Sequence, residues 1–307
     1  MQTLQSHSHG NSSQHKRDAM TSVLAQLLGP GLVITDGAWG TQLQAQGLQP
    51  GECPDGWNLT HPDRVRQVAQ SYVDAGSSVI LTNTFRSNRI TLAGHGLADR
   101  VEEINRAGVA ISRSAAGARA RVFASMGPTG KMLMMGEVTE EEVFAAFAEQ
   151  AAALHAADAL VLETMTDLEE ARIAVRAAKT TGLPVIASMV FDSGKDKDRT
   201  MMGSTPEEVA GVLAEAGADV IGANCGLGME DYIPVAQRLR AATSLPVWIK
   251  PNAGLPELVD GHIVYRTTSA EFARLAGGLK DAGVAFVGGC CGTSPAFVRA
   301  LHAALLA

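Results

Sequence analysis

The chain alternates between short apolar runs and longer amphipathic segments along almost its whole length. Eight runs rich in β-branched and other apolar residues have the composition of strands that are buried on both faces of a sheet. These runs cover residues 32–36, 78–83, 121–126, 158–163, 184–190, 219–224, 246–251 and 284–290. Each is followed by a loop and most by a segment with helical spacing of apolar residues, so the pattern predicts repeated β–α units.

The segments between the runs carry helix signals. Amphipathic helices are expected at 65–75, 140–156, 167–180, 205–216, 232–242 and 269–282. Thr205-Pro206 places a capping hydroxyl before a proline at the first helical position, and Ala-Gly pairs such as Ala216-Gly217 mark helix ends. Eight parallel strands most simply close into a single-domain (β/α)8 barrel, the TIM-barrel fold. A doubly wound open sheet is the alternative.

Composition excludes several classes of protein. The chain has 307 residues and a formal net charge of −7, and it has no lysine- or arginine-rich run. Nucleic acid is therefore not expected as a partner. No apolar stretch is long enough to span a bilayer or to form a signal core, which predicts no membrane partner and a soluble, cytoplasmic protein. Residues 1–20 are polar and are expected to form a disordered leader before a barrel over residues 21–307, with Met20 as an alternative start.

Three of the four cysteines follow two of the predicted strands. Cys225 directly follows the run 219–224, while Cys290 ends the last run and Cys291 follows it, inside Gly288-Gly289-Cys290-Cys291-Gly292. In a barrel these strands are close to one another, and three thiolates with one open position are typical of a catalytic Zn²⁺ site. A disulfide between adjacent cysteines closes a strained ring. Burial as small apolar residues is the other alternative, which the glycine frame and the third cysteine disfavour.

Polar residues also follow other strands, where barrel enzymes place their catalytic groups. Asp36 ends the first run and Glu163 ends the fourth, while Asn252 lies just after the seventh. For Asp36-Gly37 a simple turn is the alternative interpretation, and for Glu163-Thr164 a helix cap. Asn252 or a water molecule is expected to hold the open zinc position before substrate binds.

Six segments, in order along the chain, resemble the homocysteine S-methyltransferase family. They are Asp36-Gly37-Ala38-Trp39-Gly40-Thr41, Leu81-Thr82-Asn83-Thr84-Phe85, Met126-Gly127-Pro128-Thr129-Gly130, Gly222-Ala223-Asn224-Cys225, Pro251-Asn252-Ala253-Gly254 and Gly288-Gly289-Cys290-Cys291-Gly292-Thr293. The resemblance runs from about residue 32 to the end and is closest to the homocysteine-binding domain of cobalamin-dependent methionine synthase.

The resemblance implies a zinc-dependent enzyme that methylates L-homocysteine to methionine. It implies that Cys225, Cys290 and Cys291 are the zinc ligands and the catalytic centre, and that Asp36 and Glu163 bind the substrate ammonium. Thr84 and Asn252 are expected to line the substrate site. Backbone N–H groups around Gly37 and Gly127 are expected to bind the carboxylate, because glycine-rich turns form anion-binding nests.

The methyl donor is less constrained than the acceptor. A methylcorrinoid, a sulfonium or a quaternary ammonium would each serve, and the chain has no Asp-x-His-x-x-Gly corrinoid motif. We therefore expect a corrinoid on a separate protein, or free cobalamin, to dock near Trp39 and the methionines Met132, Met134 and Met135. Trp39 and Trp57 would instead suit a small cationic donor, since aromatic faces attract such groups.

Two other functions compete with this prediction. One is a non-catalytic homocysteine- or zinc-binding subunit of a methyltransferase complex. The other is an unrelated barrel enzyme such as a phosphate-binding aldolase, which the Cys290-Cys291 pair disfavours. Lys250 departs from the resemblance, because an acidic residue is expected there, and Cys53 is expected to be a bystander.

Overall fold

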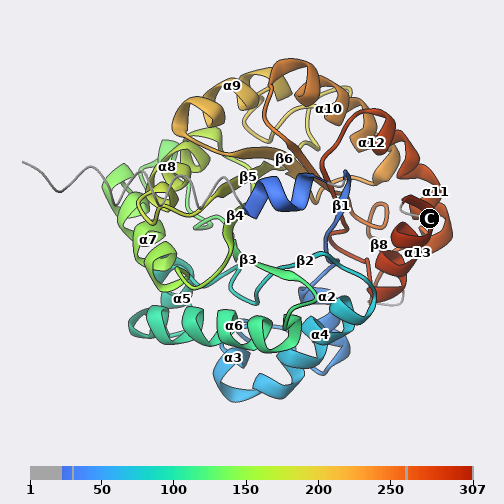
Figure 1. Ribbon diagram of the computed structural model, residues 1–307. Coiled ribbons are helices and arrows are strands. Elements are labelled where there is room, and N and C mark those ends of the chain that lie inside the picture. The colour runs from blue at the N-terminus through green and yellow to red at the C-terminus, as the bar shows by residue number, and fades with distance from the viewer. Residues whose placement is uncertain (1–22, 30, 260–261, 306–307) are drawn as a thin grey trace, which may run out of the picture.

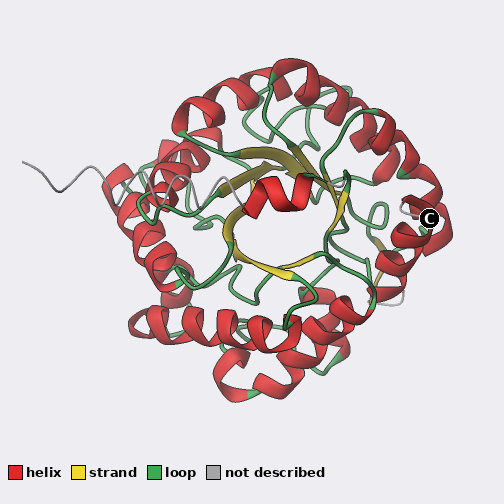
Figure 2. Ribbon diagram, viewed as in Figure 1, coloured by secondary structure: helices red, strands yellow, loops and turns green. Residues whose placement is uncertain are grey.

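The eight predicted strands form one parallel barrel. The computed structural model describes residues 23–29, 31–259 and 262–305, so the predicted leader at 1–20 lies outside the described residues. The strand order in the sheet is β1-β10-β7-β6-β5-β4-β3-β2. A parallel bridge between Thr35 and Val79 joins the two end strands. The ring of strands is therefore closed, as Figures 1 and 2 show, and the (β/α)8 prediction is confirmed over the open-sheet alternative.

Six of the eight strands are shorter than the apolar runs that predicted them, whereas β3 has the same bounds as its run and β4 is one residue longer. They are β1 (Val33–Ile34), β2 (Val79–Ile80), β3 (Arg121–Met126), β4 (Ala159–Met165), β5 (Val185–Met189), β6 (Val220–Asn224), β7 (Val247–Lys250) and β10 (Phe286–Val287). The residues that follow each strand form the loops at the carboxyl end of the barrel, where the predicted site residues lie.

The helices form an outer ring around the strands (Figure 2). The longer ones are α4 (Pro62–Asp74), α6 (Val101–Ala116), α7 (Glu140–Ala153), α8 (Leu168–Lys179), α9 (Pro206–Ala216), α10 (Met229–Ala242) and α13 (Pro295–Leu305). Thr139 and Thr205 form capping boxes with the glutamates three residues later, which fixes the start of α7 and α9. The helix predicted at 269–282 is divided into α11 (Ser269–Leu275) and α12 (Gly277–Asp281), where Gly277 and Gly278 weaken the helix.

Several short elements were not predicted. These are the helices α2 (Gly40–Ala45), α3 (Trp57–Thr60) and α5 (Arg89–Ala93), the 3-10 turns at Ala98–Arg100 and Leu133–Met135, and a hairpin of β8 (Glu257–Val259) and β9 (His262–Val264). The hairpin pairs antiparallel, with Leu258 opposite Ile263. Both side chains are exposed, so the segment lacks the buried face that makes a strand recognisable in a sequence.

The half of the barrel interior nearer the amino ends of the strands, called the lower half below, is an apolar core. Its cluster includes Val79, Phe123, Val161, Trp248 and Phe286, which come from five different strands. A short helix at residues 23–28 lies across this end of the barrel, with its apolar side chains against the same cluster. Among the described residues, no helix combines the length and the apolar character needed to cross a membrane.

The upper half of the interior is polar. Two residues beyond the apolar layer, the same strands carry Ser125, Glu163, Ser188 and Lys250, all buried. Because side chains on a strand alternate between two faces, residues two apart point to the same side. The strands thus provide a core below and a polar floor above, at the carboxyl end of the barrel.

Candidate active site

The three cysteines of the two glycine-framed motifs lie together at the carboxyl end of the barrel. Cys225 follows β6, and Cys290 and Cys291 follow β10. Their sulfur atoms lie within 4.8 Å of one another, and the Sγ atoms of Cys225 and Cys291 are 3.8 Å apart. Cys53 is not part of this group. The convergence predicted for three thiols from separate strand ends is therefore present.

The donor set fits Zn²⁺. Tetrahedral zinc with Zn–S bonds of about 2.3 Å requires sulfur atoms about 3.8 Å apart. The Cys225–Cys291 separation of 3.8 Å already meets this spacing. Three thiolate donors are the ligands that zinc favours, and a fourth position would remain for another sulfur.

The three thiols carry little charge at neutral pH unless a cation binds. A hydrogen bond with Cys290 lowers the pKa of Cys225, but a hydrogen bond with Cys291, burial and repulsion from Cys291 outweigh it and raise this pKa to about 11. The pKa of Cys290 is raised by its hydrogen bond with Cys225 and by burial, against an opposing hydrogen bond with Cys291. Three such thiols do not ionise together at neutral pH unless a bound cation compensates their charge.

The backbone near the cysteines is strained. Cys225 has φ of 65° and Thr164 has φ of 60°, both in the left-handed region that non-glycine residues rarely adopt. Such strain costs on the order of 1–3 kcal/mol at each position and is concentrated at functional sites. Strain at both positions supports the assignment of this end of the barrel as the active site.

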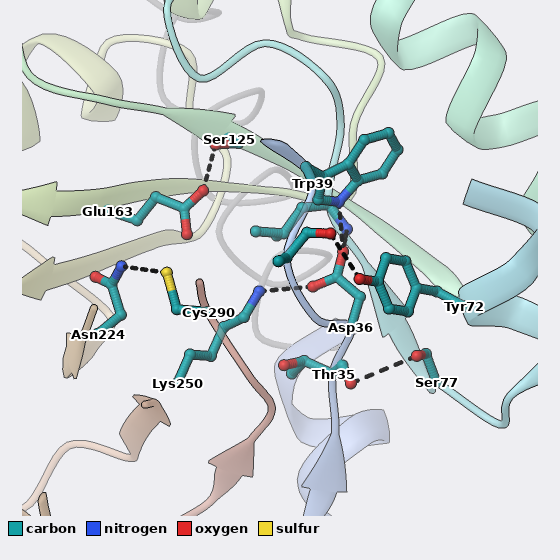
Figure 3. Close-up of polar contacts among 12 residues, drawn as sticks. Thr35, Asp36, Trp39, Tyr72, Ser77, Ser125, Glu163, Asn224, Lys250 and Cys290 are labelled. Carbon is teal, nitrogen blue, oxygen red and sulfur yellow. Dashed lines mark hydrogen bonds and ion pairs between the residues drawn. The ribbon is translucent and has the colours of Figure 1, made fainter. Parts of the chain in front are cut away.

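Asn224 connects these two strained positions. Its side chain donates to Thr164 Oγ1 at 2.8 Å and accepts from the Thr164 N–H and the Ser188 hydroxyl. The same side chain donates to Cys290 Sγ at 3.8 Å (Figure 3). Sequence reasoning did not identify Asn224 as a site residue, although it directly precedes Cys225 and ends β6.

A cavity of about 410 Å³ opens above the three cysteines. Cys225, Cys290 and Cys291 line it together with Gly37, Trp39, Glu163 and Lys250, and the segment between α2 and α3 supplies one wall. Of the predicted substrate-binding residues, Gly37 and Glu163 thus line this cavity with the cysteines. Asp36, Thr84 and Asn252 are not among its lining residues.

Glu163 is a buried acid at the cavity. Its side chain accepts a hydrogen bond of 2.5 Å from Ser125 Oγ. Burial raises the pKa of Glu163, while the nearby charge of Lys250 and the Ser125 hydroxyl oppose the rise. This carboxylate therefore has a nearby cation and a hydrogen-bond donor, yet one oxygen lacks a hydrogen-bond partner among the described residues.

Asp36 lies behind the cavity and forms a buried ion pair with Lys250. The Lys250 Nζ is 2.6 Å from Asp36 Oδ1, and the two side chains are 3% and 0% exposed. The other oxygen of Asp36 accepts from Trp39 Nε1 and from the Leu81 N–H, both at 2.7 Å (Figure 3). Both oxygens are thus engaged within the protein, and the predicted contact of Asp36 with substrate stays a prediction.

Thr84 and Asn252 also have partners away from the cavity. Thr84 shares a hydrogen bond with Thr82 and donates to the Ser125 carbonyl. Asn252 donates to the Gly226 carbonyl at 3.2 Å, and its buried Oδ1 atom has no hydrogen-bond partner. The substrate contacts expected of both residues stay predictions.

The remaining expectations have mixed outcomes in the structure. The Gly127 N–H donates to the Phe85 carbonyl at 2.8 Å, so it is not free to bind an anion. Trp57, expected to suit a cationic donor, is buried against His61 with ring centroids 4.5 Å apart and does not line the cavity. Met134 and Met135 are exposed, in the segment that follows β3.

Comparisons with known proteins identify the family. Residues 33–305 match the family model described as homocysteine S-methyltransferase. Methionine synthase of Mycobacterium tuberculosis (strain ATCC 25618 / H37Rv) is 33% identical over 303 residues, covering 92% of this chain and 25% of that protein. Methionine synthase of Mycobacterium leprae (strain TN) is 31% identical over 311 residues, covering 95% and 26%. The chain thus spans about a quarter of the length of these curated relatives.

A solved structure supports the same fold. The homocysteine methyltransferase MmuM from Escherichia coli, in its metallated form, superposes with a TM-score of 0.76 at 24% identity, over 91% of this chain and 99% of that one. This similarity supports the barrel fold, and the family model covers nearly all described residues. The chain belongs to the homocysteine S-methyltransferase family.

Proposed function

We propose that the protein methylates L-homocysteine to methionine with Zn²⁺ held by Cys225, Cys290 and Cys291. The observation that carries this proposal is the convergence of three thiols at one end of a cavity in a member of this family. When bound, zinc would keep the homocysteine thiol deprotonated and so supply a thiolate nucleophile. Reduced thiols are needed, which favours a cytoplasmic setting.

The chain's own residues would orient the acceptor. Glu163 lines the cavity with one oxygen that lacks a hydrogen-bond partner, and we assign it to the substrate ammonium. Asn224 donates to Cys290 Sγ and would hold that ligand in place. The homocysteine sulfur then attacks the methyl carbon of the donor, forming the new C–S bond. The old bond from that carbon breaks, and its electron pair leaves with the donor.

We favour a methylcorrinoid on a separate protein as the donor. In the described chain, the large exposed apolar side chains are Met132, Met134, Met135, Met201, Met202, Leu255, Leu258 and Ile263. All lie in segments that follow β3, β5 and β7, at the end of the barrel where the cavity opens. Exposed apolar side chains in several loops at one end of a barrel suit a protein-binding surface. The similarity to methionine synthases supports methionine as the product.

A small cationic donor is the second candidate. Trp39 lines the cavity, and its ring would attract a sulfonium or quaternary ammonium group. The similarity of fold to MmuM is compatible with a barrel that acts alone.

Donor-specific assays test these proposals. Zinc-loaded protein and L-homocysteine would be incubated separately with methylcobalamin, a methylcorrinoid protein, S-methylmethionine and betaine, and methionine would be measured. We expect methionine with the corrinoid donors. Turnover with S-methylmethionine or betaine in the absence of any corrinoid would refute the corrinoid assignment. Stoichiometric zinc binding without methyl transfer from any donor would instead support the non-catalytic subunit.

A further inference from the structure

The ammonium group of Lys250 has unused hydrogen-bond donors inside the cavity wall. The residue is 2% exposed, and its Nζ donates to Asp36 Oδ1 at 2.6 Å. An ammonium group carries three donors. Asp36 is the sole hydrogen-bond acceptor for Nζ among the residues that the structure describes, so two donors lack a protein partner. A buried charged group with unpaired donors is costly, and an anionic ligand would relieve that cost.

The surroundings of Lys250 keep it charged and in place. Burial lowers the pKa of Lys250, but the charges of Asp36 and Glu163 outweigh burial and raise it. The Nζ lies 5.7 Å from the centre of the Trp248 ring, which belongs to the apolar layer below. Asp36 is itself anchored by Trp39 and by the Leu81 N–H. The cation is thus fixed at the floor of the cavity.

Two opposite charges meet the cavity at its floor. Lys250 and Glu163 both line it, on β7 and β4, with Cys290 between them in the view of Figure 3. The polar end of homocysteine carries an ammonium and a carboxylate, and so requires one charge of each sign. The Gly127 N–H, expected to bind the carboxylate, already donates to the Phe85 carbonyl.

We propose that Lys250 receives the α-carboxylate of the acceptor thiol while Glu163 receives its ammonium. This inference rests on the proposed function, because it takes homocysteine as the acceptor. The two charges then fix the direction in which the amino acid enters, so that its sulfur lies toward the three cysteines. Lys250 is a specificity-determining residue, and Asp36 positions it. A thiol without a carboxylate would leave the Lys250 donors unpaired and would bind less tightly.

Ligands that lack one charged group test this assignment. Dissociation constants would be measured by calorimetry on zinc-loaded protein for three thiols: L-homocysteine, 3-mercaptopropylamine, which lacks the carboxylate, and 4-mercaptobutanoate, which lacks the ammonium. The double variant Asp36→Asn/Lys250→Met removes both charges of the ion pair, so neither partner of the pair is left alone, and Glu163 keeps its hydrogen bond from Ser125. An asparagine oxygen can still accept from Trp39 and the Leu81 N–H.

The double variant should discriminate among the three thiols. We expect its Kd to rise about 10- to 100-fold for homocysteine and 4-mercaptobutanoate, the effect of a charge-assisted hydrogen bond, with no change for 3-mercaptopropylamine. Glu163→Gln is the matched control and should give the reverse pattern, with losses for homocysteine and 3-mercaptopropylamine only. Zinc content and thermal unfolding would be checked for each variant. If Asp36→Asn/Lys250→Met does not fold, Asp36→Asn/Lys250→Gln preserves a polar pair and serves the same purpose.

The outcomes separate this inference from the proposed function. Equal losses for all three thiols would show that Lys250 only supports the structure, and unchanged homocysteine binding would place the carboxylate elsewhere. Either result overturns the inference. If wild-type protein binds 4-mercaptobutanoate through Lys250 but not homocysteine, the anion subsite stands and the proposed acceptor falls. Binding of neither thiol overturns both.

Discussion

The same strands line the lower and upper halves of the barrel interior, but with apolar side chains in one half and polar or charged side chains in the other. On β3, β4 and β7 the lower layer holds Phe123, Val161 and Trp248, and two residues later come Ser125, Glu163 and Lys250. The lower layer buries rings that pack on one another, whereas the upper layer holds buried charges, strained backbone and partly buried thiols. Burial of apolar area stabilises the fold, and buried charge opposes it. The barrel therefore separates the residues that stabilise it from those that we assign to catalysis.

Loss of a zinc ligand should give the largest functional effect and a small effect on the fold. Cys290→Ala removes one of three sulfur donors, and zinc affinity should fall about 100- to 1,000-fold, a per-ligand share of typical zinc binding energies. Methyl transfer should be abolished. The metal-free variant should unfold like metal-free wild type, because the apolar layer is intact. Zinc content by elemental analysis and thermal unfolding would check both parts, and full zinc occupancy in Cys290→Ala would contradict the assigned ligands.

Removing a side chain from the lower layer should have the opposite consequence, a large loss of stability with no loss of zinc. Phe123 is fully buried, with its ring centroid 6.3 Å from that of Trp248 and 6.5 Å from that of Phe286. Phe123→Ala should lower the free energy of unfolding by about 3–5 kcal/mol, the usual cost of a buried phenylalanine. Zinc stoichiometry at low temperature should stay at the wild-type value. Denaturant unfolding measures the free energy of unfolding, and metal analysis measures the zinc stoichiometry. A loss of zinc in folded Phe123→Ala would show that the two layers are not independent.

Within the upper layer, Glu163 can be tested apart from the cysteines. Glu163→Gln keeps the shape but removes the charge proposed to hold the ammonium, so the homocysteine KM should rise about 10- to 100-fold. Zinc content should not change, because Glu163 is not among the proposed ligands. Ser125→Ala removes the hydroxyl that donates to Glu163 and should give a smaller rise. An unchanged KM in Glu163→Gln, measured by steady-state kinetics, would place the ammonium elsewhere.

Asp55, in the cavity wall between α2 and α3, should give the smallest effect and one that depends on pH. Burial raises the pKa of Asp55 to about 6, although hydrogen bonds from Ser87 and the Arg86 N–H oppose the rise. The folded protein therefore retains a proton that the unfolded chain has lost, and the free energy of unfolding falls as pH rises from about 4 to about 6. The two pKa values bound this loss at about 3 kcal/mol, and local relaxation should reduce it to about 1–2 kcal/mol.

Asp55→Asn should flatten this slope. Ser87 and the Arg86 N–H both donate to the same oxygen, Oδ1, which asparagine retains. Denaturant unfolding of both proteins between pH 4 and pH 7 would compare the slopes. Parallel curves for wild type and Asp55→Asn would show that another group titrates.

The strands and the cysteine cluster could be predicted because their signals are local. Runs such as 121–126 combine apolar and β-branched residues, and Cys290-Cys291 lies in a glycine frame directly after such a run. The Asp36–Lys250 pair joins residues 214 positions apart, and nothing local marks it. In the sequence, Asp36 lies at the end of a strand, which is typical of a substrate-binding residue. That position is the same whether its oxygens are free or paired with a lysine from β7. The sequence likewise does not show that Thr164 and Cys225 adopt left-handed backbone.

Asp36 also closes the ring of strands. Its Oδ2 atom accepts the Leu81 N–H at 2.7 Å, beside the single Thr35–Val79 bridge between β1 and β2. The Ser78 N–H also donates to the Ile34 carbonyl at 2.8 Å, so a side chain that anchors the cavity's cation adds to the backbone contacts across this seam. Amide exchange at Leu81 should therefore report on both closure and cavity charge. If Lys250 is replaced during evolution, only some residues can replace Asp36, because the new residue must still accept a hydrogen bond from the Leu81 N–H. We therefore expect substitutions at the two positions to be correlated.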